Sequence, residues 1–268
     1  MNDNPAQPPP VPVETSLAAR LTNVFVAPGE VFAEVKASPV RHANWIVPAV
    51  IFILVSWGMG ALLMSQDAIK QQMAEIQDQA FQKQFQKQID SGKMTQVQVD
   101  QFKAGAAKYA GIAQIFAVVI VPLLSAVKIP FLGGFVIWFG GTIIFKRPFP
   151  YMKGVEIAGM VLVVVALGAL VKGLLAAALG NIFASPGPAL LLKPFDATNP
   201  WHNLLATMDV FALWALLLKA TALAKLSDLS FAKAVAWVGG VAAVVTGGLF
   251  AFSWAMQQLM ATISNQGR

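Results

Sequence analysis

Three ionisable residues, Lys128, Lys172 and Asp209, interrupt long apolar stretches of the sequence. A charged side chain at the centre of a bilayer costs at least about 2.5–3.5 kcal/mol, so such residues commonly pair with each other or line a polar path. Asp209 would then neutralise either Lys172 or Lys128. Alternatively, the long lysine side chains reach the lipid headgroups unaided. We take these three residues as the candidate site and leave the ion-pair partner open.

The sequence offers little other chemistry. It contains no cysteine, and its two histidines, His42 and His202, have no neighbouring acidic residue and no metal-ligand spacing. The motifs of serine hydrolases, zinc peptidases and phosphate-binding loops are absent. Glu156 and Lys153 are interpreted as a solvated ion pair at the end of a helix. We therefore expect no enzymatic activity, no cofactor and no metal.

The composition requires the candidate residues to be carried by membrane spans. Of 268 residues, 57% are hydrophobic and only 12% are charged, whereas soluble proteins contain about 25% charged residues. The excess apolar residues must face lipid, because the few charged residues cannot cover a water-exposed surface. The lysines and arginines are scattered rather than clustered, so we expect no binding of nucleic acid.

Five apolar stretches are long enough to cross a hydrocarbon core of about 30 Å. They lie at residues 45–64, 111–145, 154–179, 204–223 and 231–256. The second stretch contains Pro122 and Pro130 and is either one kinked span or two short ones. One span is favoured, since it puts the basic residues around Lys146 on the same side as the other basic short loops. Five spans place the N-terminus in the cytoplasm and the C-terminus outside.

The remaining segments belong outside the hydrocarbon. Residues 1–15 form a Pro-rich, disordered tail, and residues 16–44 form two amphipathic helices that lie in the lipid headgroup layer. Residues 65–110 are rich in glutamine and predict an extracytoplasmic helical hairpin, whose second arm opens with a capping box of Thr95 and Gln98. Phe81 and Phe85 either pack its two arms together or dock a protein partner. Residues 257–268 form a C-terminal tail, and the fold class is an all-α, five-span membrane bundle.

Several short motifs resemble a known family. They are the lead-in LTNVFVAPGEVF of residues 21–32, the start of the first span from Trp45 to Pro48, Gly140-Gly141 before the basic loop, and residues 213–234. Together they resemble bacterial members of the Yip (Ypt/Rab-interacting protein) family. The resemblance covers most of residues 21–254 and implies a five-span helical domain with a cytoplasmic N-terminus.

The resemblance also bears on function. Eukaryotic relatives bind Rab-type GTPases and organise membranes, but this sequence lacks their Asp-Leu-Tyr-Gly-Pro motif and carries Ala158-Gly159 where a Tyr-Ala pair is common. The resemblance therefore implies a protein of the bacterial inner membrane. We expect a non-enzymatic scaffold that organises the lipid bilayer or binds a protein partner through its hairpin or N-terminal helices, and its glycine-rich spans also allow a homo-oligomer. The alternative is a transporter or channel subunit with a polar path near Lys128, Lys172 and Asp209.

Overall fold

The computed structural model describes residues 15–192, 195–196 and 199–266, so the predicted Pro-rich tail lies outside the described residues except for Thr15. Within that part of the chain, five helices are long and apolar enough to cross a membrane. They are α3 (Ala43–Ser65), the helical run Gln96–Ile144, α7 (Tyr151–Leu179), α9 (Val210–Ser227) and α10 (Phe231–Gln266), whose apolar part is Phe231–Met256. This number of candidate spans agrees with the prediction.

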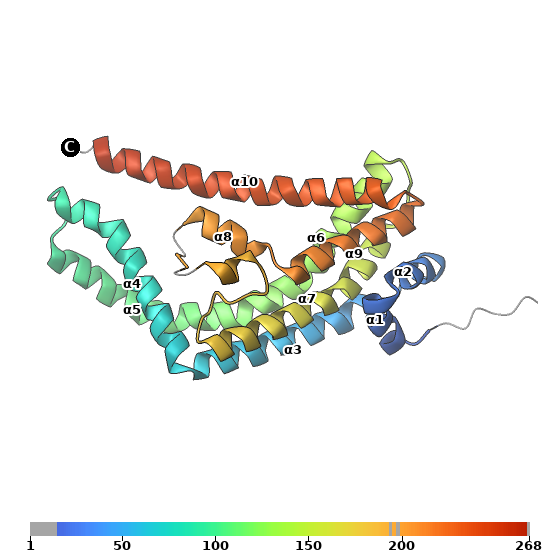
Figure 1. Cartoon of the computed structure of the whole chain (residues 1–268), viewed down its shortest axis with the longest axis horizontal. Coiled ribbons are helices and arrows are strands. Elements are labelled where there is room, and N and C mark those ends of the chain that lie inside the picture. The colour runs from blue at the N-terminus through green and yellow to red at the C-terminus, as the bar shows by residue number, and fades with distance from the viewer. Residues whose placement is uncertain (1–14, 193–194, 197–198, 267–268) are drawn as a thin grey trace, which may run out of the picture.

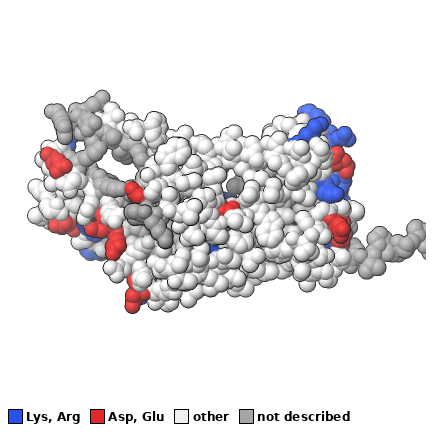
Figure 2. Space-filling model, in the orientation of Figure 1, with Lys and Arg blue, Asp and Glu red and all other residues white. Residues whose placement is uncertain are grey.

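The spans run along the long axis of the molecule (Figure 1). The N-terminal helices and the turns that lead into α7 and α10 lie at one end, and the C-terminus lies at the other. Figure 2 shows that charged side chains gather at both ends of the visible face, while the band between them is almost free of charge. This distribution matches a bundle whose middle faces lipid.

The second span is one continuous helical run. It consists of α5 (Gln96–Ile115), the π-helical turn η1 (Phe116–Ile120), α6 (Val121–Trp138) and a second π-helical segment, η2 (Phe139–Ile144). Pro122 lies two residues after the end of η1, and the helix changes direction in this region (Figure 1). The run has 49 residues, or about 70 Å at 1.5 Å per residue, so its first part extends well beyond the hydrocarbon core.

The part that extends beyond the bundle pairs with α4 (Asp67–Asp90) to form the predicted hairpin. Its second arm opens with the predicted capping box between Thr95 and Gln98. The rings of Phe85 and Phe102 lie 5.1 Å apart, Phe81 stacks beside them, and Phe85 is buried. The hairpin structure favours the packing interpretation of Phe81 and Phe85 over the docking one.

The centre of the bundle is α7, which packs against α3, α6 and α9. Gly134 and Gly154 allow α6 and α7 to approach closely: a Cβ on Gly134 would lie 2.6 Å from the backbone nitrogen of Val155, and one on Gly154 would lie 2.6 Å from the carbonyl oxygen of Gly134. Half of the apolar window of α7 is buried, compared with 6% for α10. The last helix therefore lies along the outside of the bundle (Figure 1).

Three boundaries or placements differ from the sequence predictions. Helices α1 (Leu17–Val26) and α2 (Pro28–Ala37) form as expected, but several of their apolar side chains, including Val24 and Phe32, are buried in the core that they share with the bundle helices. The fourth span begins at Val210, because Asp209 caps it and α8 (Pro200–Thr207) is a separate helix. A short 3-10 helix, η3 (Pro188–Leu191), precedes α8. The predicted C-terminal tail is helical as far as Gln266, since α10 continues without a break.

Candidate functional site

Asp209 and Lys172 form an ion pair between the start of α9 and the later part of α7. Oδ1 of Asp209 accepts hydrogen bonds from the backbone nitrogens of Phe211 at 2.8 Å and Ala212 at 2.9 Å, which leaves Oδ2 for Lys172 Nζ. The Asp209 side chain is 2% exposed and that of Lys172 is 39% exposed. One carboxylate therefore caps α9 at its end away from α2 and neutralises a lysine of α7.

Lys128 does not join this pair. Its side chain lies on α6, is exposed, and makes no ion pair or hydrogen bond within the described part of the chain. The structure therefore brings together two of the three predicted site residues. For Lys128, an exposed lysine on a span matches the alternative in which the side chain reaches the headgroups.

A fourth ionisable residue of the spans, Lys219, was not selected from the sequence. It lies near the middle of α9 and is half-buried; a Cβ on Gly133 of α6 would be 3.6 Å from its Cε. Among the described residues it has no ion-pair or hydrogen-bond partner. Lys219 could have been selected from the sequence, because it is an ionisable residue inside a long apolar stretch, as Lys128 is.

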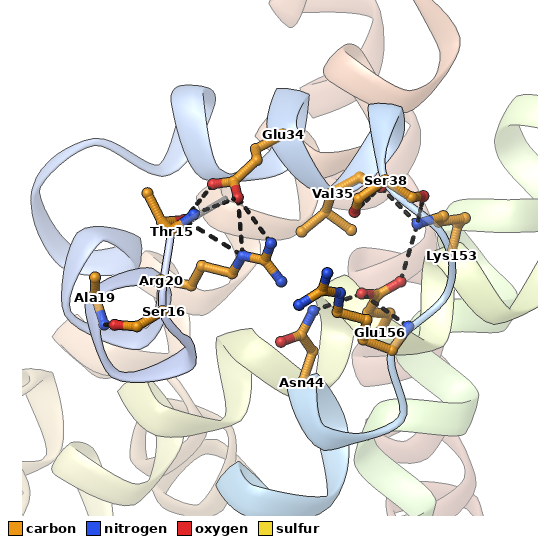
Figure 3. Close-up of polar contacts among 11 residues, drawn as sticks. Thr15, Ser16, Ala19, Arg20, Glu34, Val35, Ser38, Asn44, Lys153 and Glu156 are labelled. Carbon is orange, nitrogen blue, oxygen red and sulfur yellow. Dashed lines mark hydrogen bonds and ion pairs between the residues drawn. The ribbon is translucent and has the colours of Figure 1, made fainter. Parts of the chain in front are cut away.

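The most extensive polar network lies at the end of the bundle that carries α1 and α2, where α7 meets the segment joining α2 and α3 (Figure 3). Glu156 has a fully buried side chain, and Oε2 accepts from Lys153 Nζ at 3.2 Å. Its Oε1 accepts from Asn44 Nδ2 at 2.5 Å and from the backbone nitrogen of Arg41 at 3.3 Å. The prediction of a solvated pair is therefore wrong, since α2 and α3 cover both side chains.

Each charged side chain of this pair makes hydrogen bonds to the end of a different helix. Lys153 Nζ donates to the carbonyl oxygens of Val35 at 2.5 Å and Ser38 at 2.6 Å, at the C-terminal end of α2. Glu156 lies at the N-terminal end of α3, where it accepts from Arg41 and Asn44. A cation at a helix C-terminus and an anion at a helix N-terminus both have the favourable sign. The pair thus fixes the α2–α3 connection to α7.

A second cluster holds α1 against α2. Arg20 is 1% exposed, and its Nη2 lies 2.7 Å from Glu34 Oε1, while the hydroxyl of Thr15 donates to Glu34 Oε2 at 2.5 Å. Burial raises the pKa of Glu34, but the hydrogen bonds from Thr15 and Arg20 and the charge of Arg20 outweigh it, so the pKa lies below its ordinary value. The sequence signal for this cluster is the position of Arg20 on the apolar stripe formed by Leu17, Leu21 and Val24.

Within the described ranges, no three acidic or histidine side chains gather as a metal site. His42 lies at the start of α3, where its Nδ1 accepts from the indole nitrogen of Trp45 at 3.3 Å. His202 lies on α8, and its Nδ1 accepts from the backbone nitrogen of Asp196 at 2.9 Å. Both histidines therefore make local contacts, and the polar clusters of the molecule join helices together.

Comparison with known proteins gives one match. A family model described as the Yip1 domain matches residues 22–255, which include all the helices from α2 to α9, the second half of α1 and most of α10. No curated protein and no solved structure matches the chain.

Proposed function

The chain belongs to the Yip1 domain family and is a multi-pass membrane protein, and from this premise we propose that it acts without catalysis, as a scaffold that presents a helical hairpin to a protein partner. The observation that carries the proposal is the hairpin of α4 and α5, which extends from the bundle and is continuous with the second span (Figure 1). A partner bound to such a hairpin is attached directly to a membrane helix.

The first turns of α5 carry apolar side chains that the hairpin itself does not cover. Val97 is 64% exposed, and Phe102 is 53% exposed although it packs against Phe81 and Phe85. This part of the helix precedes the apolar stretch that begins near residue 111, so it lies in water, where exposed apolar area often marks an interaction surface. Val97 and Phe102 are therefore the residues we assign to the partner-binding face.

The end of the bundle that carries α1 and α2 also supports a scaffold role, because its helices are held rigidly together. Arg20 joins α1 to Glu34 of α2, and Lys153 joins the end of α2 to α7. The N-terminal helices are thus joined to each other by an ion pair, and to the spans by the hydrogen bonds of Lys153 and by apolar packing. Such a platform holds the spans in one arrangement while the hairpin binds a partner on the other side.

We propose that the end carrying α1 and α2 faces the cytoplasm, in the inner membrane of a bacterium. This orientation is supported by Lys36, Lys146, Arg147 and Lys233, which are exposed at that end, since short cytoplasmic loops are rich in lysine and arginine. Alkaline phosphatase fused after Arg268 should be active, and green fluorescent protein fused there should be dark. Fluorescence of the second fusion would contradict the orientation.

A transporter or channel role has less support. It requires several polar groups to converge on one path. Lys172 and Asp209 pair with each other, but Lys128 makes no polar contact with either of them. We therefore retain the scaffold as the single proposed function.

Site-specific photo-crosslinking tests the partner-binding face. A benzophenone amino acid at position 97 should crosslink one protein in native membranes, whereas the same probe at the exposed Gln79 of α4 should not. The substitution Val97→Lys should reduce recovery of that protein in a detergent pull-down. Identical crosslinked products from positions 97 and 79, or unchanged recovery with Val97→Lys, would refute the proposal.

A further inference from the structure

A cavity of about 360 Å³ lies at the turn between α9 and α10, at the end of the molecule that carries α1 and α2. Its lining consists of Thr221, Ala224, Lys225, Asp228, Leu229 and Phe231. The charged pair of this set lies at the turn, whereas Thr221 and Ala224 lie further into the span. The cavity therefore combines two charged side chains with a lining that is otherwise mainly apolar.

The rim carries more positive than negative charge. Lys36 Nζ lies 2.6 Å from Asp228 Oδ2. The hydrogen bond and charge of Lys36, with a smaller contribution from the charge of Arg147, hold the pKa of Asp228 below its ordinary value. Arg147 lies close to the end of α9, because its backbone nitrogen donates to the carbonyl oxygen of Gly141 at 2.8 Å and a Cβ on Gly141 would meet the hydroxyl of Ser227. Lys225 lines the same cavity. Three cations against one carboxylate leave an excess of two positive charges.

The segments beside the cavity strengthen this positive field. Lys146 precedes Arg147 in the loop between η2 and α7, and Lys233 lies in the first turn of α10; both side chains are exposed. Figure 2 shows lysine and arginine side chains clustered at this end of the molecule. In addition, α10 begins at Phe231 in the cavity lining, and the N-terminal end of a helix carries partial positive charge.

We propose that this cavity binds the headgroup of an anionic phospholipid. Lys225 and Arg147 hold the phosphate, while the acyl chains lie against Phe231 and the surface of α9. Basic pockets between membrane helices on the cytoplasmic side recognise anionic headgroups in this way. Inorganic phosphate would meet the same cations, but it has no chain to cover the apolar part of the cavity. This inference concerns the lipid around the bundle and does not depend on the partner of the hairpin.

The test compares three additives by their effect on the melting temperature of the full chain in dodecylmaltoside. Dioleoylphosphatidylglycerol should raise the melting temperature in a saturable way, because a ligand that binds only the folded state stabilises it. Dioleoylphosphatidylcholine and inorganic phosphate should have no such effect. Equal stabilisation by phosphatidylcholine would overturn the charge recognition, and equal stabilisation by inorganic phosphate would reduce the cavity to a free-anion site.

Paired variants locate the site. Lys225→Gln combined with Arg147→Gln should weaken the affinity for phosphatidylglycerol about 30-fold, since each basic residue near the surface contributes a factor of about five. The matched control is Lys93→Gln combined with Lys108→Gln, which removes two exposed lysines from the hairpin and should leave the affinity unchanged. An equal loss in both double variants would overturn the assignment to the cavity.

A substitution that should increase the affinity for the lipid separates an effect on lipid binding from damage to the fold. Asp228→Asn removes the competing carboxylate and releases Lys36, so the affinity for phosphatidylglycerol should rise severalfold even if the lipid-free protein melts at a lower temperature. An unchanged or lower affinity in this variant would overturn the proposal.

Discussion

Removal of the Glu156 carboxylate should be the most damaging single polar substitution in the bundle. In the variant Glu156→Ala, Asn44, the backbone nitrogen of Arg41 and Lys153 each lose the acceptor that this carboxylate provides. Breaking a buried pair costs about 3–5 kcal/mol. Lys153 keeps the carbonyl oxygens of Val35 and Ser38, so its charge is not left wholly without partners and we expect the lower end, about 3 kcal/mol.

The conservative variant Glu156→Gln separates the contribution of the ion pair from that of the hydrogen bond to Asn44. Its amide oxygen still accepts from Asn44, but the ion pair with Lys153 is lost, so we expect a loss of about 1.5 kcal/mol. Equilibrium unfolding in mixed dodecylmaltoside and dodecyl sulfate micelles, followed by tryptophan fluorescence, measures the free energy of each variant. Hydrogen exchange should increase first in residues 28–44, because this network holds that segment to α7.

A double-mutant cycle and a matched control make the result decisive. Lys153→Met combined with Glu156→Gln should show a coupling energy of about 1–3 kcal/mol. Asp67 and Lys70 have the same spacing of three residues, but their side chains are 97% and 51% exposed, so Asp67→Asn should leave the unfolding free energy unchanged within error. A coupling energy near zero for Lys153 and Glu156, or equal effects at the two pairs, would refute the reasoning.

Three further predictions follow from the same structure. The pKa of Glu34 is lowered, so its stabilising effect is present above the ordinary glutamate value of 4.5 and is lost as the pH falls through the lower, folded-state value; the difference in melting temperature between the native chain and Glu34→Gln should be constant above about pH 5.5 and vanish in stronger acid. Asp209→Asn keeps the helix cap and removes the charge opposite Lys172, so circular dichroism melts should show a small loss, whereas Asp209→Ala should cost about 0.5–2 kcal/mol more; equal losses would contradict the capping role. Gly134→Ala should cost about 1–3 kcal/mol by forcing α6 and α7 apart, while Gly58→Ala, which meets nothing within 4 Å, should be neutral in the same detergent unfolding assay.

The sequence predicts the local features of this fold well. Uninterrupted apolar length gives the five spans, and the capping box of Thr95 and Gln98 gives the start of α5, because these signals depend on residues close together in the chain. The predicted start of the fourth span is too early, since the apolar residues Leu204 and Leu205 of α8 extend the hydrophobic stretch to positions before the cap at Asp209.

The polar sites were less predictable because they depend on distant segments. Glu156 accepts from Asn44, which is 112 residues away in the chain, so its burial is not readable from its neighbours. For Asp209, the sequence reduces the partner to two lysines, and only the packing of α7 against α9 selects Lys172. Lys219 is different: its signal is local, and the same criterion that identified Lys128 applies to it.

Because the run from Gln96 to Ile144 is continuously helical, the direction in which the hairpin faces depends on the number of residues in that helix. Successive residues of an α-helix are rotated by about 100° around its axis. One residue inserted between Phe102 and the buried part of α6 would therefore swing the outer face of α5 by more than a quarter of a circle. A π-helical turn takes up one additional residue without a loop. The turn η1, which lies between α5 and α6, therefore sets the direction in which the outer face of the hairpin points.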